Sequence, residues 1–381
     1  MIIFNPPIEI KSLNMAYNNY SLYFYSNSLQ TPSYCDITAM GMSARLYPDP
    51  LGRFFFNFKP YVTALINTRN FEDRTLTNIS SGNPESFVYN VTAGTFLQRN
   101  VTFKIVFAGT APATETQSYV MSWLAGVEQV GTKPDFSLGD LLVLSPFQKD
   151  SANSYYLKYW QGYPFDMAFF TNLNSLIVHN ETNLVSQEFN VIGFGTRLFF
   201  SDGRTDETLE DLIPLAEGYN KLRLVRDENF PQQDKYLTLE KISYKEGVYL
   251  KWFNKYGGYS YWLFENTYAI DRTTKSLGEL DYDNQNLSDS YTRSLTIGKE
   301  SYDAIKVVAE LLTDDERTIV EGILDSPKIY MFTGKPFSRN SNKDWVEVKL
   351  KTGSARLKNP RQPLTNFTFD LELPQRYTQV L

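Results

Sequence analysis

Apolar and polar positions alternate along two stretches that flank a pair of glycines, and this pattern predicts a β-hairpin over residues 248–264. A period of two is what a pleated strand imposes on its side chains. Gly257 and Gly258 lack a Cβ and can take the positive φ values that a tight turn needs. Large rings occupy both faces of this hairpin. It must therefore be covered twice, by its own core and by a second surface, and that surface could belong to another subunit.

Short apolar runs of similar character recur through the first 225 residues, and connections containing Asn, Gly and Ser separate them. Spacing of this kind is typical of antiparallel β-sandwich or barrel modules, and not of alternating strands and helices. The fold class we expect is therefore mainly β. The runs that carry this prediction are residues 21–25, 53–58, 101–107, 141–144, 168–170, 176–178, 191–194, 198–200 and 222–225.

One helix is predicted at residues 313–325. Thr313 and Glu316 form a capping box, in which the hydroxyl and the carboxylate each satisfy a backbone amide at the helix start. Apolar residues then recur on one face, and Pro327 ends the helix. Further apolar or alternating runs follow at residues 328–332, 345–350 and 367–373. The C-terminal part is thus expected to be one short capped helix packed on a small sheet.

A polar, proline-interrupted passage at residues 227–234 predicts a domain boundary. At 381 residues the chain is too long for one small core. We expect an N-terminal β-rich domain at residues 1–228, which could hold two sandwich modules. A C-terminal β module at residues 229–381 would contain the aromatic hairpin and the helix.

Composition strengthens the β prediction and removes several classes of function. Tyr and Phe number 26 and 27, and aromatic residues favour half-buried pleated surfaces. The net charge of −6 and a pI near 5.1 oppose contact with a phosphate backbone, so no nucleic-acid partner is expected. One cysteine, Cys35, excludes an intrachain disulfide. No signal-peptide pattern or bilayer-spanning run is visible, so we expect synthesis in a cytoplasm without membrane insertion.

The sequence offers no constellation of residues with catalytic or metal-binding spacing. His179, the one histidine, has no assignable carboxylate and nucleophile, and one His with one Cys cannot form a zinc site. Residues 281–284 leave a carboxylate Ca²⁺ site open, but a solvated turn is favoured because the Gly and distal Glu of an EF-hand are missing. No carboxylate pair for glycoside hydrolysis stands out. We therefore expect a protein that is not an enzyme, with no catalytic residue, metal or cofactor.

The aromatic residues allow two interpretations. They could stack on sugars, or they could lie in the core and at protein interfaces, which also use rings as anchors. The second interpretation is favoured. The candidates for sugar stacking are Trp160, Trp252, Tyr256, Tyr259 and Trp262, and the interface candidates on the hairpin are Trp252, Tyr256, Tyr259, Tyr261 and Trp262.

Several landmarks, in a consistent order along nearly the whole chain, carry a resemblance to a known family. They are Phe4-Asn5-Pro6, the segment at residues 45–57 that begins Arg45-Leu46-Tyr47 and ends Phe55-Phe56-Asn57, the hairpin turn at residues 252–259, and the helix start at residues 312–316. Each landmark is short. Together they resemble virion structural proteins common in tailed phages and prophages of Bacteroidetes bacteria.

That resemblance implies a non-enzymatic particle component of a tail or baseplate. By looser analogy it implies a ring-forming protein of the distal-tail kind, whose partners are further copies of itself and neighbouring tail proteins. It brings no catalytic residues, and it implies a location in the virion after synthesis in the bacterial cytoplasm. The alternative is a receptor-binding module or adhesin that recognises host surface glycan, with a glycan-cleaving enzyme as a third hypothesis. The role of the polar segment at residues 272–290, which departs from the family pattern, stays open.

Overall fold

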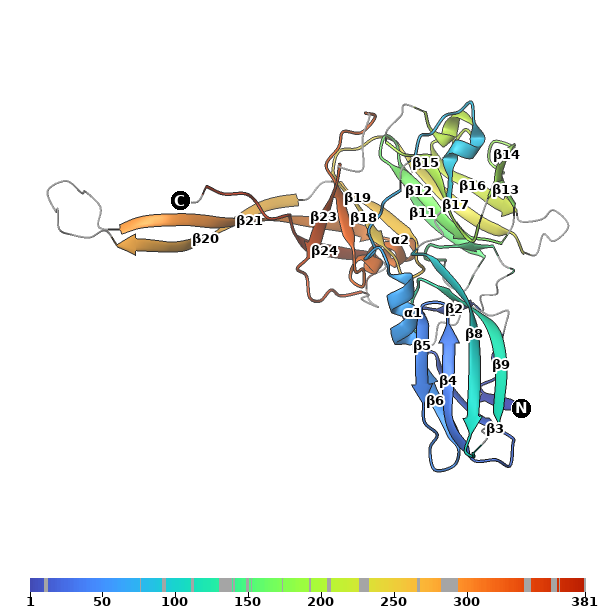
Figure 1. Ribbon diagram of the computed structural model, residues 1–381. Helices are drawn as coiled ribbons and strands as arrows, with labels where there is room; N and C mark the ends of the chain where they lie inside the picture. The colour runs from blue at the N-terminus through green and yellow to red at the C-terminus, as the bar shows by residue number, and fades with distance from the viewer. Residues whose placement is uncertain are drawn as a thin grey trace.

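The computed structural model shows a mainly β protein with short helices, as the sequence predicts. It describes the chain apart from residues 10–12, 76, 91–93, 111–112, 130–138, 140, 149–150, 152, 173, 192, 204–206, 226–232, 266–267, 282–293, 339–343, 358–361, 363 and 380–381. The strands form three parts: an N-terminal lobe, a second lobe and a single seven-stranded sheet. We call this last part the third sheet, and it carries a long two-stranded arm (Figure 1).

The N-terminal lobe consists of two sheets that enclose one core. Phe24 on one sheet and Phe103 on the other meet edge to face with ring centroids 5.3 Å apart, and both are fully buried. One sheet has the order β1 (Ile2–Asn5), β3 (Ser21–Ser26), β6 (Arg53–Asn57). The other has the order β2 (Leu13–Met15), β9 (Thr114–Leu124), β8 (Phe96–Phe107), β4 (Pro32–Ala39), β5 (Met42–Leu46).

Helix α1 (Lys59–Ile66) follows β6 directly and was not predicted from the sequence. Pro60 lies in its first turn, where a missing N–H is harmless. Val62 and Ile66, one turn apart, are buried against the lobe. The apolar run that begins in β6 continues into this helix. The change in the spacing of apolar residues, from every second residue in the strand to every 3.6 residues in the helix, is therefore not visible in the sequence.

The second lobe also has two sheets. Their orders are β10 (Leu142–Val143), β12 (Phe165–Phe170), β15 (Gly195–Ser201), β7 (Val88–Asn90), and β11 (Ser154–Trp160), β17 (Lys235–Ile242), β16 (Gly218–Val225), β13 (Ser175–Asn180), β14 (Val185–Asn190). Short 3₁₀ turns, η1 (Pro84–Phe87) and η2 (Leu209–Asp211), border it. Residues 191 and 193–194, expected in a strand, lie instead between β14 and β15.

The pairing of β17 decides where this lobe ends. β17 lies between β16 and β11, and it runs parallel to β11. Parallel neighbours need a long crossover, which β12 to β16 provide. The second lobe therefore extends to Ile242, beyond the boundary at residue 228 that the sequence led us to expect, and residues 226–232 lie outside the described part. β2 and β9 are also parallel, so the sheets are not purely antiparallel.

The third sheet has seven strands and contains the predicted hairpin. β18 and β19 pair antiparallel from Val248 opposite Phe264 to Phe253 opposite Tyr259. The sheet order is β19 (Tyr259–Phe264), β18 (Val248–Phe253), β22 (Ile329–Phe332), β23 (Trp345–Leu350), β24 (Thr365–Glu372), β21 (Ser294–Leu312), β20 (Tyr268–Asp281).

The capped helix is present as α2 (Asp314–Val320), which continues into the 3₁₀ turn η5 (Glu321–Ile323). Both hydrogen bonds of the predicted capping box form. The Thr313 hydroxyl accepts from the Glu316 amide, and the Glu316 carboxylate accepts from the Thr313 amide at 2.7 Å. Ile319 and Val320 bury one face of the helix against the hydrophobic core.

The polar segment after the hairpin forms part of a long arm. β20 and β21 pair from Tyr268 opposite Val307 to Asp281 opposite Ser294, and they project far from the body (Figure 1). β24 supports β21 at residues 304–312. Residues 294–303 of β21, which lie farther from the body, pair with β20 and not with β24.

The turn of the β18–β19 hairpin generates a first prediction. Gly257 has a φ of +87°, and a Cβ there would lie 2.5 Å from the carbonyl oxygen of Ala125 in the N-terminal lobe. We expect Gly257→Ala to lower the free energy of unfolding by about 1–3 kcal/mol, because it adds backbone strain and separates the turn from that lobe.

Urea unfolding measures this change. The matched control is Gly353→Ala, since a Cβ at Gly353 meets nothing within 4 Å. Equal effects of the two substitutions would contradict the close approach of the hairpin turn to the N-terminal lobe.

Candidate functional site

The hairpin rings that were candidates for an interface are covered by the chain itself. Trp252, Tyr256, Tyr261 and Trp262 are 0 to 7% exposed, and Tyr259 is half-buried. Residues from the second lobe, α2 and the third sheet form one continuous core around this hairpin. The second cover therefore comes from within the same chain, and these four rings present no surface to another subunit.

The tryptophans that were candidates for sugar stacking are also buried. Trp160 is 1% exposed and meets Trp262 edge to face with centroids 5.1 Å apart. A ring enclosed in this way cannot lie against a sugar in the folded protein. The three candidate tryptophans, Trp160, Trp252 and Trp262, are core residues.

The turn of the hairpin joins three parts of the molecule. The Asn254 side-chain amide donates to the carbonyl oxygen of Leu144 at 2.9 Å, and its oxygen accepts from the amides of Tyr256 and Gly258. The Val127 amide donates to the Lys255 carbonyl at 2.7 Å. Asn254 thus shapes the turn and fixes it to the second lobe, and Lys255 fixes it to the chain that follows β9.

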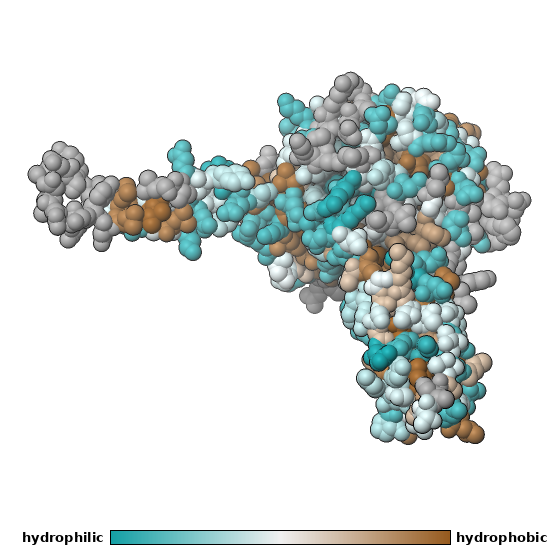
Figure 2. Space-filling model, in the orientation of Figure 1, coloured by the Kyte–Doolittle hydropathy of each residue, from teal (hydrophilic) through white to brown (hydrophobic). Residues whose placement is uncertain are grey.

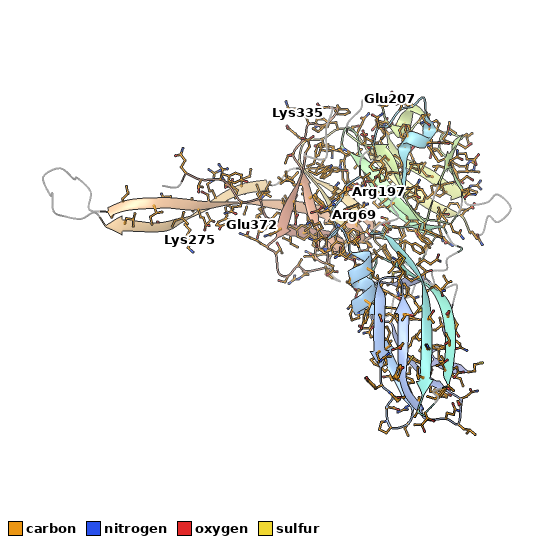
Figure 3. The ribbon with its side chains drawn as sticks, in the orientation of Figure 1. Arg69, Arg197, Glu207, Lys275, Lys335 and Glu372 are labelled. Atoms are coloured by element: carbon orange, nitrogen blue, oxygen red, sulfur yellow. The ribbon has the colours of Figure 1, made fainter. Side chains whose placement is uncertain are left out.

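Beside this turn lies a buried network of four charges, which we name the junction network: Asp73, Asp166, Arg197 and Lys251. Their side chains are 1 to 10% exposed. Asp73 follows α1 in the connection to the second lobe, Asp166 and Arg197 come from β12 and β15, and Lys251 comes from β18. Arg197 lies at the centre of the molecule, where the lobes meet (Figure 3).

Each charge of the junction network has an opposite partner. Arg197 donates two hydrogen bonds to Asp166, at 2.8 and 2.6 Å, in the bidentate geometry that suits guanidinium and carboxylate. Its third nitrogen donates to Asp73 at 2.9 Å. Lys251 donates to the other Asp73 oxygen at 2.7 Å. Two positive and two negative charges make the set neutral. Asp73 can contact both cations only when the segment after α1, strand β15 and strand β18 are all in place.

Aromatic rings surround the cations. The Lys251 ammonium lies 4.3 Å from the centroid of the Trp345 ring and 5.3 Å from that of Tyr330. Arg197 lies 4.9 Å from the Tyr259 ring. Tyr261 donates from its hydroxyl to Asp166. These rings attract the cations through their π faces, which strengthens the pairing.

Burial and charge shift the pKa values of the network in opposite directions. Burial raises the pKa of Asp73, but the charges of Arg197 and Lys251 outweigh it and place that pKa well below its ordinary value. Burial lowers the pKa of Lys251, and Asp73 only partly offsets this effect. Burial would lower the pKa of Arg197 too, yet Asp166 and Asp73 raise it well above its ordinary value.

The cavity at the junction network is small. Its volume is about 50 Å³, and its lining includes Arg69, Thr75, Arg197 and Tyr259. That space suits one or a few water molecules and not a ligand of ordinary size. The arrangement orients the lobes relative to one another and is a structural site.

The other candidate residues fall elsewhere. His179 lies half-buried on β13, directly opposite Arg223 on the neighbouring antiparallel strand β16. Among the described residues, no group of three or more His, Cys, Asp or Glu side chains is placed to hold a metal. Residues 282–284 of the possible Ca²⁺ loop lie outside the described part. In that part of the chain, no helix has the length and hydrophobicity that crossing a bilayer requires.

Sequence reasoning missed all four members of the junction network. A signal existed, because Asp166, Arg197 and Lys251 are single charges within otherwise apolar or uncharged strand runs that proved fully buried. A lone charge in such a strand must find a partner. Its partner could not be read from the sequence, since Asp73 lies 124 residues from Arg197 and 178 residues from Lys251.

No protein-family model matches this sequence, and no curated protein matches it. Among solved structures, a structure of fibronectin(III)-like modules of Clostridium thermocellum CbhA is 6% identical, covers 64% of this chain and 95% of its own, and has a TM-score of 0.20. A chimeric titin Z1Z2 tandem is 7% identical over 61% of this chain and 96% of its own, with a TM-score of 0.16.

A third solved structure is a Ca²⁺-stabilised adhesin that helps an Antarctic bacterium reach out and bind ice. It is 10% identical, with 79% of this chain and 66% of that chain covered and a TM-score of 0.16. Likenesses of this size carry no argument for the fold or function of this protein.

The junction network generates a second prediction. Asp73→Asn leaves two buried cations with one carboxylate, and we expect it to lower the free energy of unfolding by about 3–5 kcal/mol. The neighbouring exposed pair of Glu72 and Arg74 provides the control. Glu72→Gln should change stability by less than about 1 kcal/mol in the same urea titration, because exposed ion pairs contribute little. Similar effects of both changes would show that the network does not stabilise the junction.

A third prediction concerns pH. In the unfolded chain Asp73 takes up a proton below a pKa of about 3.9, whereas the folded chain keeps it ionised to much lower pH. The unfolded state then binds more protons, so the contribution of Asp73 is complete above about pH 5 and is lost as pH falls. Between pH 5 and 2, the slope of unfolding free energy against pH should be smaller in Asp73→Asn than in the unaltered protein. Parallel slopes would contradict the shifted pKa.

Proposed function

We propose that this protein is a structural component of a phage virion that acts by protein-protein assembly, as a ring-forming tail-tip or baseplate protein. Two things support the proposal. The sequence landmarks resemble virion structural proteins, as described above. The single structural observation that carries it is the arm formed by β20 and β21, which projects far from the body of the protein (Figure 1).

The outer part of the arm has the properties of a segment that docks. A two-stranded hairpin alone is only marginally stable in water. Leu277 and Leu280 on β20 are 42% and 55% exposed, and Leu280 pairs across the hairpin with Leu295. Figure 2 shows apolar surface gathered near the far end of the arm, separated from the body by polar surface. Covering this apolar end would stabilise the arm, so it favours a contact with another molecule.

The inner part of the arm is firmly anchored. Arg272 and Asp303 are opposite each other on the two strands, and Arg272 donates to both Asp303 oxygens at 2.7 and 3.1 Å. Arg376, from the segment after β24, donates to the same carboxylate at 2.9 Å. These hydrogen bonds, above all the one from Arg272, lower the pKa of Asp303 to about 2. A clamp at the base fixes the direction in which the arm leaves the body.

A surface that could receive the arm lies on the N-terminal lobe. Tyr23, Tyr25 and Phe55 are 55%, 40% and 50% exposed on the outer face of the β1-β3-β6 sheet, and the rings of Tyr23 and Phe55 lie 4.9 Å apart. This lobe and the arm leave the body in different directions (Figure 1). The arm of one copy would therefore contact the aromatic face of the next. Such head-to-tail contacts generate a ring when the rotation closes.

A fourth prediction tests this assembly. Leu277→Asp together with Leu280→Asp should abolish self-association, because a charge on the arm would have to be buried at the contact. Light scattering of the purified protein, followed by negative-stain imaging, measures the oligomeric state. Leu357→Asp with Leu364→Asp is the matched control, since these leucines are 47% and 39% exposed and do not belong to the arm.

Tyr23→Asp with Phe55→Asp should disrupt the same assembly from the receiving side. If the arm variant dissociates the oligomer and this variant does not, the receiving surface lies elsewhere on the neighbour. An unaltered protein that stays monomeric at its highest soluble concentration, or an oligomer that survives the arm substitutions, contradicts assembly through the arm.

A further inference from the structure

A cavity of about 480 Å³ opens where the second lobe borders the loop that follows β22, away from the junction network and the arm. Its size lies within the range of small-molecule sites. Six of its nine lining residues carry a hydroxyl, side-chain amide or carboxylate group, and the exposed ring of Phe337 also lines it. The lining residues are Tyr159, Gln161, Gly162, Ser201, Gly203, Thr208, Glu210, Phe337 and Ser338.

The inner lining of this cavity consists of fixed polar groups. Tyr159 and Ser201 are 1% and 6% exposed, and both come from strands. The Ser201 hydroxyl accepts a hydrogen bond from the Gly203 amide at 3.3 Å, which leaves its own proton free to donate. Buried hydroxyls on rigid strands can distinguish the hydroxyl pattern of a ligand, because their positions do not adapt to a wrong one.

Glu210 supplies a carboxylate that is held in place. It accepts from the Lys241 ammonium at 2.6 Å, and it is hydrogen-bonded to Tyr159, whose pKa is raised by burial and then by the Glu210 charge. Lys241 also pairs with Glu217 at 3.3 Å. A carboxylate offers about four acceptor positions, so Glu210 can accept further hydrogen bonds from a ligand. Its negative charge favours hydroxyl donors and repels anionic ligands.

Phe337 forms the aromatic part of the lining, and its backbone is in an unusual conformation. Its φ is +55°, in the left-handed region that side chains other than Gly rarely adopt. Its amide donates to the Gly162 carbonyl at 3.0 Å, and its ring packs so closely that a Cβ at Gly162 would lie 2.6 Å away. The side chain is nevertheless 60% exposed. A strained residue that displays an aromatic ring beside a polar cavity is typical of a binding site.

We propose that this cavity binds a neutral mono- or disaccharide. Sugars present hydroxyl groups along their edges and apolar C–H faces, which match the polar inner lining and the Phe337 ring respectively. Among the described lining residues there is one fixed carboxylate and no cation, a combination that favours a neutral sugar over a uronic or sialic acid. This saccharide site is a function additional to the assembly proposed above, because it would let each copy bind glycan. The buried tryptophans do not line it.

The test uses the purified full chain and a defined panel of sugars. The probes are the methyl glycosides of glucose, galactose, mannose and N-acetylglucosamine, together with maltose, lactose and glucuronic acid. Saturation-transfer NMR detects binding, and titration measures the dissociation constant. We expect at least one neutral sugar to bind and glucuronic acid to bind more weakly or not at all.

Two substitutions assign the binding to this cavity. Phe337→Ala should weaken it about tenfold through loss of stacking, and Glu210→Gln by a similar factor through loss of the charged acceptor. Tyr219→Ala is the control, because Tyr219 is 64% exposed on β16 and does not line the cavity. Urea unfolding checks that each variant folds, and Glu210→Gln still leaves Lys241 paired with Glu217.

The proposal is overturned if no neutral sugar of the panel binds, or if binding survives both cavity substitutions. It is also overturned if glucuronic acid binds more tightly than every neutral sugar. The arm variant Leu277→Asp with Leu280→Asp should bind the sugar as the unaltered protein does. Failure of assembly and failure of saccharide binding are therefore measured separately.

Discussion

A charged side chain in the protein interior requires an opposite charge, and at the centre of this molecule that requirement spans three separate parts of the chain. Asp73 pairs with a cation from β15 and a cation from β18 at the same time. If the second lobe moved away from the third sheet, the hydrogen bond between Arg197 and Asp73 would break in a medium of low dielectric constant, which is unfavourable. Hydrophobic burial supplies most of the stability of each sheet, whereas the junction network specifies how the sheets are arranged. The direction of the arm relative to the N-terminal lobe depends on that arrangement.

The hairpin beside the network shows why aromatic content alone does not identify a binding surface. Rings on both of its faces lie in one core that the second lobe, α2 and the third sheet form around it, and its turn lies against the chain around Ala125. The residues that remain exposed, such as Tyr23 and Leu280, are fewer and lie at the ends of the molecule. Phe337, which drew no attention in the sequence, is exposed in a strained conformation beside a cavity. Position in the fold, and not ring count, separates core from surface.

Local signals in the sequence were reliable, and long-range ones were absent. The alternation around Gly257 predicted β18 and β19, and Thr313 with Glu316 predicted the start of α2, because each signal involves residues close in the chain. The lone charge at Arg197 was visible, but its partner Asp73 is distant in the sequence and joins it only through tertiary packing. The sequence showed the arm only as a polar segment. It did not predict the pairing of β20 with β21, because the strands of an exposed hairpin need no alternation of apolar and polar residues.

The path of β7 has a consequence for how the protein is made. The chain enters the second lobe at β7, returns to the N-terminal lobe at β8, and only later supplies β15, where Thr196 pairs with Asn90. The two lobes are therefore interleaved in the chain. At ribosomal speeds of about 5–20 residues per second, β7 would wait roughly 5–20 s for the strand that pairs with it. During that interval it is an open strand edge on the nascent chain, and a stop or delay in translation there would lengthen its exposure to wrong partners.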